Sequence, residues 1–436
     1  MYVWRCRGNS RFLGRMKKEI LRIEGQHPLH GTVQVNGNKN AALAVIPAAL
    51  LSDETVIIEN VPKIDDIRNE CAIIESLGGE VHFEGRNLHI DPRGVTGYQC
   101  PHELARRIRA SLYFLGVLLG RGGRAEVSLP GGCDIGARPI DQTLKGITAL
   151  GAQIETVFGS LHAQADELIG AEVYLDIASV GATVNTMLAA CKATGFTTIY
   201  NAAKEPHIVD LANMLNSMGA SIKGAGTSAI RIQGVPYLHS TTYTIIPDQI
   251  ETGTLMIMAA ASQGDVLIQG AIPFHMEALT AKLLEMGARV EEYDESIRVS
   301  SGGDHRHINV KTLPYPGFPT DLQQPISALL TTARGTSIVT ETIFEQRFRH
   351  LDEMRRMGAL VQVEDRTAII TGVDKLMGCR VEASDLRAGV SLIIAGLMAE
   401  GVTTIEGVKQ IDRGYETIEK RLALLGAKIK RTMVDE

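Results

Sequence analysis

A short apolar pattern that ends in a glycine recurs six times along the chain, at intervals of roughly 70 residues. In every copy the side chains one and four positions before the glycine are apolar, as Leu77 and Ile74 are before Gly78. This spacing places them on one face of a helix, and glycine is common just past a helix end. The pattern predicts six amphipathic helices that end at Gly78, Gly151, Gly219, Gly287, Gly358 and Gly426.

A second kind of helix is predicted ahead of each of these helices. Each copy begins with polar or charged residues and then becomes apolar on nearly every face, which is typical of a helix buried inside a domain. Its polar first turn should emerge at a functional surface, because a helix N-terminus attracts anions. The six segments span residues 36–54, 106–123, 178–195, 248–265, 320–335 and 384–401.

Short segments typical of β-strands follow the six glycines. Strands that alternate with helices in this way predict an α/β fold. A unit of roughly 70 residues has room for one βαβ-type repeat. The chain is therefore expected to contain six βαβ-type repeats in two domains of three. The pattern alone leaves open whether the repeats form a ring, a stack or two bundles.

The composition argues against several classes of function. Of the 436 residues, 44% are hydrophobic and 22% are charged, and the net charge is −6. This balance argues against broad binding to nucleic acid or to an anionic membrane. The longest apolar run, 41–51, has about half the length that a membrane span needs. The six cysteines lack the spacing of zinc sites and indicate reduced thiols in the cytoplasm.

Ten segments stand out beside the repeats: GNKNAAL (37–43), RRIRAS (106–111), SLPGGCDIGARPID (128–141), SVGAT (179–183), NAAKEP (201–206), PDQIETG (247–253), FPTDLQ (318–323), ETIFEQRF (341–348), SDLRAG (384–389) and IDRGYE (411–416). In this order they resemble the motifs of the enolpyruvyl transferases, in particular the branch that acts on UDP-N-acetylglucosamine. The resemblance covers the chain from residue 17 onward. It implies two three-fold inside-out α/β domains, with the active site in the cleft between them.

The resemblance also implies domain boundaries. The first domain would span 38–246 and include a glycine-rich lid at 128–141, whereas the second would combine 17–37 with 247–436. Residues 1–16 are expected to be a disordered or non-native leader. They lack the apolar centre of a signal peptide, and the sequence from Met16 onward is a more natural start.

The implied reaction moves the enolpyruvyl group of phosphoenolpyruvate to the 3′-hydroxyl of UDP-N-acetylglucosamine and releases phosphate, as the first committed step of peptidoglycan synthesis. These two small molecules are the expected partners. No metal, organic cofactor, nucleic acid or membrane partner is expected, and the oligomeric state is left open. Two other interpretations stay open: transfer to a different acceptor, such as another nucleotide or shikimate 3-phosphate, and a non-catalytic protein that binds the UDP-sugar.

Two residues are expected to move protons. Cys133 follows two glycines and precedes Asp134, which is unlike the surroundings of a buried cysteine, and Arg138 would lower its pKa. The resemblance makes Cys133 the general acid toward the substrate methylene and the residue to which fosfomycin attaches. Asp321 opens a predicted buried helix, where aspartate is a common N-cap. The resemblance makes it also the base, or the group that orients the sugar hydroxyl.

Two anionic substrates in one pocket require positive side chains there. The resemblance places Lys39, Arg138 and Arg413 at the phosphate, with Lys39 and Arg413 also catalytic. It places Arg347 and Arg387 at the substrate carboxylate, whose two oxygens match a guanidinium. Arg347 also stands out by itself, because the other repeats have an apolar residue or a tyrosine at its position on the helix stripe. A charge there needs a partner or a ligand.

The resemblance finally gives the contacts to the UDP-sugar, which are Asn40, Arg109, Arg138, Pro139, Ile140, Asp141, Ser179, Val180, Gly181, Asp321 and Ile343. The segment from Ser179 to Gly181 opens a predicted helix, whose N–H groups suit a diphosphate. Departures from common family residues occur at Thr143, Ile177 and Gln346. They bear on the identity of the acceptor more than on the type of reaction.

Overall fold

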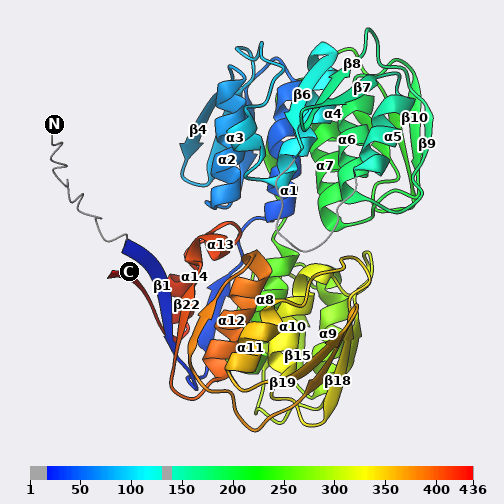
Figure 1. Ribbon diagram of the computed structural model, residues 1–436. Helices are drawn as coiled ribbons and strands as arrows, with labels where there is room; N and C mark the ends of the chain where they lie inside the picture. Colours follow the sequence, from blue (N-terminus) through cyan, green and yellow to red (C-terminus); the bar gives the residue numbers. More distant parts are fainter. Residues whose placement is uncertain (1–16, 130–139, 436) are drawn as a thin grey trace, which may run out of the picture.

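The computed structural model describes residues 17–129 and 140–435. Two lobes are joined by two neighbouring chain segments (Figure 1). In these linkers Gly37 and Pro247 form an antiparallel bridge, and the Asn38 N–H donates to the Ile246 carbonyl over 2.8 Å. The predicted leader and residues 130–139 of the predicted lid lie outside the described residues.

The first lobe contains three small sheets, with strand orders β13-β3-β5-β4, β6-β8-β7 and β11-β12-β10-β9. Along a strand such as β12, buried isoleucines alternate with more exposed residues, so one face of the sheet packs on the core. The strands are β3 (Val56–Glu59), β4 (Glu80–Glu84), β5 (Asn87–Asp91), β6 (Arg124–Ser128), β7 (Gln153–Val157), β8 (Ser160–Gln164), β9 (Glu172–Tyr174), β10 (Phe196–Tyr200), β11 (Ser221–Lys223), β12 (Ala229–Gln233) and β13 (Thr242–Thr244).

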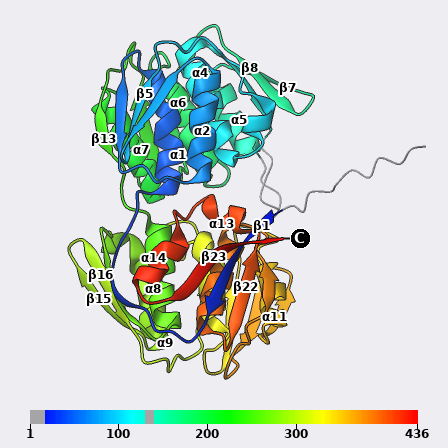
Figure 2. The same cartoon turned by 90° about the vertical axis from the view of Figure 1, so that its left-hand side faces the viewer.

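The second lobe repeats this plan, with strand orders β15-β16-β14-β2, β17-β18-β20-β19 and β21-β22-β1-β23. The N-terminal strand β1 pairs antiparallel with both β22 and β23, as Figure 2 shows, and so joins this lobe. The strands are β1 (Lys17–Glu24), β2 (His30–Gln34), β14 (Asp265–Gln269), β15 (Arg289–Tyr293), β16 (Ser296–Ser300), β17 (Asn309–Lys311), β18 (Thr336–Thr340), β19 (Leu360–Glu364), β20 (Thr367–Thr371), β21 (Arg380–Glu382), β22 (Val402–Glu406) and β23 (Lys428–Asp435).

Among the described residues, six helices are buried on most of their faces, three in each lobe, which confirms the second kind of helix predicted from the sequence. In α8, for example, every residue after Gln249 is buried. The predicted ranges were longer because they also covered the flanking turns. The helices are α1 (Lys39–Ala48), α4 (Tyr113–Gly122), α6 (Val180–Ala190), α8 (Gln249–Ala261), α10 (Gln323–Leu330) and α12 (Leu386–Met398).

The amphipathic helices are also found as predicted. The glycine after each one has a φ between +96° and +101°, a conformation that favours glycine. They are α2 (Asp65–Ser76), α5 (Asp141–Ala149), α7 (Pro206–Ser217), α9 (Glu277–Met286), α11 (His350–Arg356) and α14 (Ile418–Leu424). Shorter helical segments are α3 (His102–Ala105), α13 (Val408–Asp412) and the 3₁₀ turns η1 (Ala49–Leu51), η2 (Arg109–Leu112), η3 (Pro273–Met276) and η4 (Thr320–Leu322).

Two hydrophobic clusters follow this arrangement. One contains residues between Ala41 and Ile245, and the other combines Leu21 to Val35 with Ile250 to Ile429. Buried helices inside and sheets outside confirm the predicted fold of six repeats in two groups of three. In the part of the chain that the structure describes, no helix is long and apolar enough to cross a membrane.

Candidate active site between the lobes

Many of the predicted site residues lie where the buried helices of the two lobes face each other. Figure 1 shows α1 reaching toward the second lobe, with α8 and α12 below the junction. Lys39 is the first residue of α1, and Arg387 lies in the first turn of α12. Asp321 belongs to the 3₁₀ turn η4, which leads into α10.

Asp66, Lys39 and Arg413 form one group, the Asp66 cluster. The Lys39 ammonium lies 2.8 Å from Asp66 Oδ2, and Arg413 Nε donates to Asp66 Oδ1 over 3.0 Å from the second lobe. The Asp66 side chain is only 4% exposed. Burial alone would raise the pKa of Asp66, but the two cations hold it below its usual value. An ionised carboxylate of the first lobe thus holds one cation from each lobe.

Asp248 fixes the start of α1 from the second lobe. Its carboxylate accepts from the N–H groups of Ile250 and Glu251, over 2.7 and 3.0 Å, and so caps α8. The same carboxylate accepts from the Lys39 N–H over 2.9 Å. The position of Lys39 therefore depends on contacts at the linker as well as on α1 itself.

Asp321, Arg347 and Arg387 form a second group, the Asp321 cluster, entirely within the second lobe. Arg347 Nη2 donates to Asp321 Oδ1 over 2.6 Å, and Arg387 Nη2 donates to Oδ2 over 2.8 Å. The two arginine side chains are 4% and 6% exposed, whereas the carboxylate is 26% exposed. Burial alone would raise the pKa of Asp321, but Arg387 and Arg347 hold it well below its usual range. The two guanidinium groups are thus already arranged around a carboxylate.

The structure accounts for the charge of Arg347 and corrects one expectation about Asp321. Arg347 is buried, and its Nη1 also donates to Thr320 Oγ1 over 2.7 Å, so the charge on the apolar stripe is paired. The expected N-cap role of Asp321 is wrong, because Leu322 occupies the N-cap position of α10. The intervening 3₁₀ turn places the Asp321 carboxylate at the two arginines instead.

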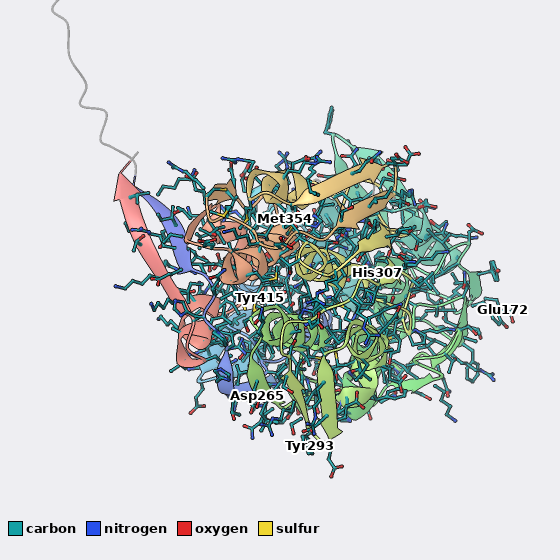
Figure 3. The ribbon with its side chains drawn as sticks, turned by 90° about the horizontal axis from the view of Figure 1, so that it is seen from below. Glu172, Asp265, Tyr293, His307, Met354 and Tyr415 are labelled. Atoms are coloured by element: carbon teal, nitrogen blue, oxygen red, sulfur yellow. The ribbon has the colours of Figure 1, made fainter. Side chains whose placement is uncertain are left out.

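The Tyr415 hydroxyl supports the Asp321 cluster through a hydrogen bond to Arg387. Arg387 Nη1 donates to Tyr415 Oη over 3.0 Å, and the same hydroxyl lies 2.8 Å from Thr254 Oγ1. Figure 3 shows Tyr415 inside the lobe, whereas Tyr293 lies at its rim. Since Tyr415 follows Arg413 by two residues, one short segment contributes to both clusters.

Glu341 also supports the Asp321 cluster, and its side chain is fully buried. Its carboxylate accepts from Thr320 Oγ1 over 2.8 Å, from Thr312 Oγ1 over 2.9 Å and from the Ile343 N–H over 2.8 Å. Thr320 in turn accepts from Arg347. Glu341 thereby connects the turn that carries Asp321 with the backbone of Ile343.

Most residues expected at the UDP-sugar come from the first lobe. Ser179 caps α6 by accepting from the Ala182 N–H over 3.3 Å, and Val180 and Gly181 form the first turn. A methyl group added to Gly181 would lie 3.8 Å from Thr143 Oγ1, so α5 lies beside this helix start. The structure thus places Thr143 beside the expected diphosphate site.

The other expected contacts are more widely spread. Asn40 follows Lys39 in α1, and Ile140 directly precedes Asp141, the first residue of α5. Arg109 begins η2, where burial lowers its pKa. Ile343 comes from the second lobe and is 37% exposed. Cys133, Arg138 and Pro139 lie outside the described residues.

Sequence reasoning did not single out Asp66, Glu341 or the Tyr415 hydroxyl. An acidic residue in the first turn of a helix is common, so Asp66 gave no signal. Tyr415 gave a weak one, because it occupies the same stripe position as Arg347 and brings a hydroxyl into a buried place. Within residues 17–129 and 140–435, no three His, Cys, Asp or Glu side chains are grouped so as to hold a metal ion.

His350 lies in the first turn of α11, close to Arg347, and leads to a prediction about acid stability. Burial lowers the pKa of His350 to about 3, against the attraction of Asp385, and the positive charge of Arg347 also lowers it. A histidine in the unfolded chain takes up a proton near pH 6.5, so the unfolded state gains a proton that the native state does not. The contribution of this group to stability should therefore fall as the pH drops from about 6.5 toward 3.

We expect His350→Leu to reduce the slope of unfolding free energy against pH between about 6.5 and 4, by up to about 1.4 kcal/mol per pH unit. Urea denaturation at several pH values measures this slope. The exposed His82→Leu is the control and should leave the slope unchanged. Parallel curves for His350→Leu and the parent protein would show that His350 does not contribute.

The chain is similar to known proteins over nearly its whole length. The sequence profile of the family described as EPSP synthase (3-phosphoshikimate 1-carboxyvinyltransferase) matches residues 23–422. A relative from Caldanaerobacter subterraneus subsp. tengcongensis, named UDP-N-acetylglucosamine 1-carboxyvinyltransferase 3, is 53% identical over 95% of this chain and 99% of its own length. A relative from Bacillus subtilis, named UDP-N-acetylglucosamine 1-carboxyvinyltransferase 2, is 52% identical over 96% of this chain and 98% of its own.

Solved structures are similar over nearly the whole chain. The enolpyruvyl transferase NikO from Streptomyces tendae has a TM-score of 0.87 at 25% identity and covers 96% of this chain and 100% of its own. EPSP synthase from Acinetobacter baumannii has a TM-score of 0.72 at 20% identity, covers 95% of this chain and 100% of its own, and supports the fold alone. On the strength of the profile match and of relatives identical at more than half of their positions, the chain belongs to the EPSP synthase family of enolpyruvyl transferases.

Proposed function

We propose that this enzyme transfers the enolpyruvyl group of phosphoenolpyruvate to the 3′-hydroxyl of UDP-N-acetylglucosamine and releases phosphate. The observation that carries the proposal is the pair of cation groups at the junction, one in the Asp66 cluster and one in the Asp321 cluster. A substrate with a phosphate at one end and a carboxylate at the other would engage both groups. The names of the relatives support UDP-N-acetylglucosamine as the acceptor.

The Asp321 cluster would bind the substrate carboxylate. Arg347 and Arg387 hold the Asp321 carboxylate through one guanidinium on each oxygen, and a second carboxylate could take the same place. Both arginine side chains are nearly buried, so they are preorganised and little desolvation remains when the ligand binds. The Asp66 cluster would bind the phosphate through Lys39 and Arg413.

Substrate binding would also activate Asp321. In the free enzyme the two arginines hold the pKa of Asp321 well below its usual range, which makes the carboxylate a weak base. A substrate carboxylate that takes over the arginines would release Asp321 and raise its pKa. The freed carboxylate, which is 26% exposed, could then accept the proton of the sugar hydroxyl.

The reaction would be an addition followed by an elimination. The 3′-hydroxyl oxygen bonds to C2 of phosphoenolpyruvate as its proton passes to Asp321, and C3 receives a proton from Cys133. In the resulting tetrahedral adduct the C2–O bond to phosphate breaks, and C3 returns its proton to the Cys133 thiolate, which restores the double bond. The proton held by Asp321 leaves with the phosphate. Lys39 and Arg413 would stabilise the phosphate as it leaves. The role of Cys133 is a proposal from the family resemblance.

The acceptor would bind mainly to the first lobe. The first turn of α6, from Ser179 to Gly181, offers N–H groups toward the diphosphate, with Asn40 near the sugar. Arg109, Ile140 and Asp141 are proposed along the nucleotide, together with Arg138 and Pro139. The product, an enolpyruvyl ether of the UDP-sugar, would enter peptidoglycan synthesis in the cytoplasm.

The proposal is tested by phosphate release from phosphoenolpyruvate with no acceptor, with UDP-N-acetylglucosamine and with shikimate 3-phosphate. We expect release only with the UDP-sugar, and loss of that release after treatment with fosfomycin. Release with shikimate 3-phosphate alone would replace the proposed acceptor. Binding of the UDP-sugar without phosphate release, measured by calorimetry, would favour a non-catalytic protein instead.

A substitution of Glu341 tests whether its hydrogen bonds help to position the Asp321 cluster. We expect Glu341→Gln to lower kcat/KM for phosphoenolpyruvate by about tenfold or more. One carboxylate oxygen accepts from Thr320 and the other accepts from Thr312 and the Ile343 N–H, and the amide keeps only one of the two as an acceptor. Steady-state kinetics measures the change. Glu364→Gln, at an exposed position of β19, is the control and should behave like the parent enzyme. Equal kinetics for the two variants would contradict a supporting role of Glu341.

A further inference from the structure

Glu70 is a buried acid that the proposed mechanism does not use. It lies in α2 and has no exposed surface, and among the described residues neither of its carboxylate oxygens has a hydrogen-bond partner. Its buried neighbours in α2 include Ile67, Ile73 and Ile74. The apolar pattern of this helix would therefore predict an apolar side chain at position 70. A carboxyl group in such a place needs a reason other than packing.

The position of Glu70 relative to Asp66 offers that reason. Residues four apart in a helix lie on the same face, with Cβ atoms roughly 5–6 Å apart. Asp66 is also buried, and it holds Lys39 and Arg413. Glu70 therefore lies one helical turn from the carboxylate that binds the two cations proposed for the phosphate, on the same face of α2.

Glu70 is expected to carry its proton. Burial and the neighbouring Asp66 raise the pKa of Glu70 well above its usual value, and the opposing attraction of Lys39 does not offset them. An ionised carboxylate with no partner would also be far costlier in this place than a neutral acid. The side chain thus holds one O–H donor on the same helix face as Asp66, and within residues 17–129 and 140–435 this donor has no hydrogen-bond acceptor in the free enzyme.

We propose that Glu70 is a positioning residue that donates its O–H to Asp66 when Lys39 and Arg413 turn to the substrate phosphate. In the free enzyme the two cations neutralise Asp66, over 2.8 and 3.0 Å. When they engage the phosphate, Asp66 would be left as a buried carboxylate with weaker partners. The Glu70 carboxyl would compensate by forming a carboxyl–carboxylate hydrogen bond, in which no covalent bond breaks and the number of protons is unchanged.

This role rests on the proposed function and makes that function more specific. It predicts that Glu70 affects ligands that carry a phosphate at the Asp66 cluster and does not affect the UDP-sugar. A purely structural role would instead change folding stability, or the affinities for all ligands together. The two roles can therefore be separated by comparing one ligand with the other.

The experiment compares Glu70→Leu, Glu70→Gln and the control Glu75→Leu, which changes an exposed glutamate of the same helix. Calorimetry measures the binding of inorganic phosphate with UDP-N-acetylglucosamine present, and kinetics gives KM for each substrate. We expect Glu70→Leu to weaken phosphate binding and to raise KM for phosphoenolpyruvate by about tenfold, with KM for the UDP-sugar unchanged. Glu70→Gln keeps an N–H donor and should stay within about threefold of the parent.

Thermal unfolding shows whether the leucine variant folds, and we expect its Tm to equal or exceed that of the parent, because an unpartnered buried acid is removed. Parent-like phosphate affinity in Glu70→Leu would overturn the proposal. So would a parallel loss of affinity for both substrates. Phosphate binding needs no turnover, so a parent enzyme that binds phosphate but releases none from phosphoenolpyruvate would contradict the proposed function and leave this test intact.

Discussion

Replacing Asp321 by asparagine is expected to lower kcat by about 10²–10⁴-fold without raising KM for phosphoenolpyruvate. Asparagine cannot take the proton of the sugar hydroxyl, so the chemical step should slow. The same change removes the negative charge that pairs with Arg347 and Arg387 over 2.6 and 2.8 Å. The substrate carboxylate would then meet the arginines without an internal competitor, so its binding should be equal or tighter.

Asp321→Asn should also reduce stability. It leaves two buried guanidinium groups without their counter-charge, and breaking a buried ion pair in this way costs about 3–5 kcal/mol. Added phosphoenolpyruvate should restore part of the lost Tm, since its carboxylate can replace the missing charge. The control is Asp352→Asn, which removes an exposed carboxylate paired with Arg355 and should change the stability by less than about 1 kcal/mol.

Steady-state kinetics and thermal unfolding decide this prediction. If KM for phosphoenolpyruvate rose strongly while kcat stayed near that of the parent, Asp321 would be a binding residue and not the base. If phosphoenolpyruvate protected the variant no better than the parent, the two arginines would not be the carboxylate site.

Cys133→Ala is expected to abolish turnover and leave the affinity for UDP-N-acetylglucosamine intact. Alanine cannot donate a proton to C3, whereas the contacts proposed for the nucleotide come mainly from other segments. Cys133→Asp should retain activity and resist thiol alkylation, because a carboxylic acid can also donate the proton. Phosphate release and calorimetry measure the two effects.

Four of the other five cysteines are expected to react slowly with alkylating agents, which helps alkylation to report on Cys133. In the part of the chain that the structure describes, burial raises the pKa values of Cys71, Cys100 and Cys191 to about 12, and it also raises that of Cys379. Such thiols form little thiolate and react slowly. Cys379→Ala, at the least buried of these four positions, is the control and should keep full activity. Loss of turnover in that control, or full turnover in Cys133→Ala, would refute the assignment.

The fold was predictable because its signal is repeated. Leu77 and Ile74 lie one and four positions before Gly78, and five other glycines repeat this arrangement, so each copy supports the others. The pairing of Arg347 was predictable for the opposite reason. Arg347 interrupts an apolar stripe, so its charge was expected to need a partner or a ligand, and it is buried and paired with Asp321.

The pairing within the site was not predictable from local patterns. Asp66 resembles an ordinary acid in the first turn of a helix, and its partner Arg413 lies 347 residues away in the other lobe. Only the tertiary fold brings them together. Asp321 was wrongly expected to cap a helix, because the sequence does not show that a 3₁₀ turn precedes α10. Glu341 likewise gains its role only from residues that the fold brings to it.

The central claim is that one substrate replaces both internal carboxylates as the partner of the four cations. A crystal structure of Cys133→Ala with UDP-N-acetylglucosamine and phosphoenolpyruvate tests it most directly. The prediction is that the substrate carboxylate lies within hydrogen-bond distance of Arg347 and Arg387, the phosphate contacts Lys39 and Arg413, and Asp321 has turned to the 3′-hydroxyl. A complex in which Asp321 keeps both arginines while phosphoenolpyruvate binds elsewhere would contradict the account.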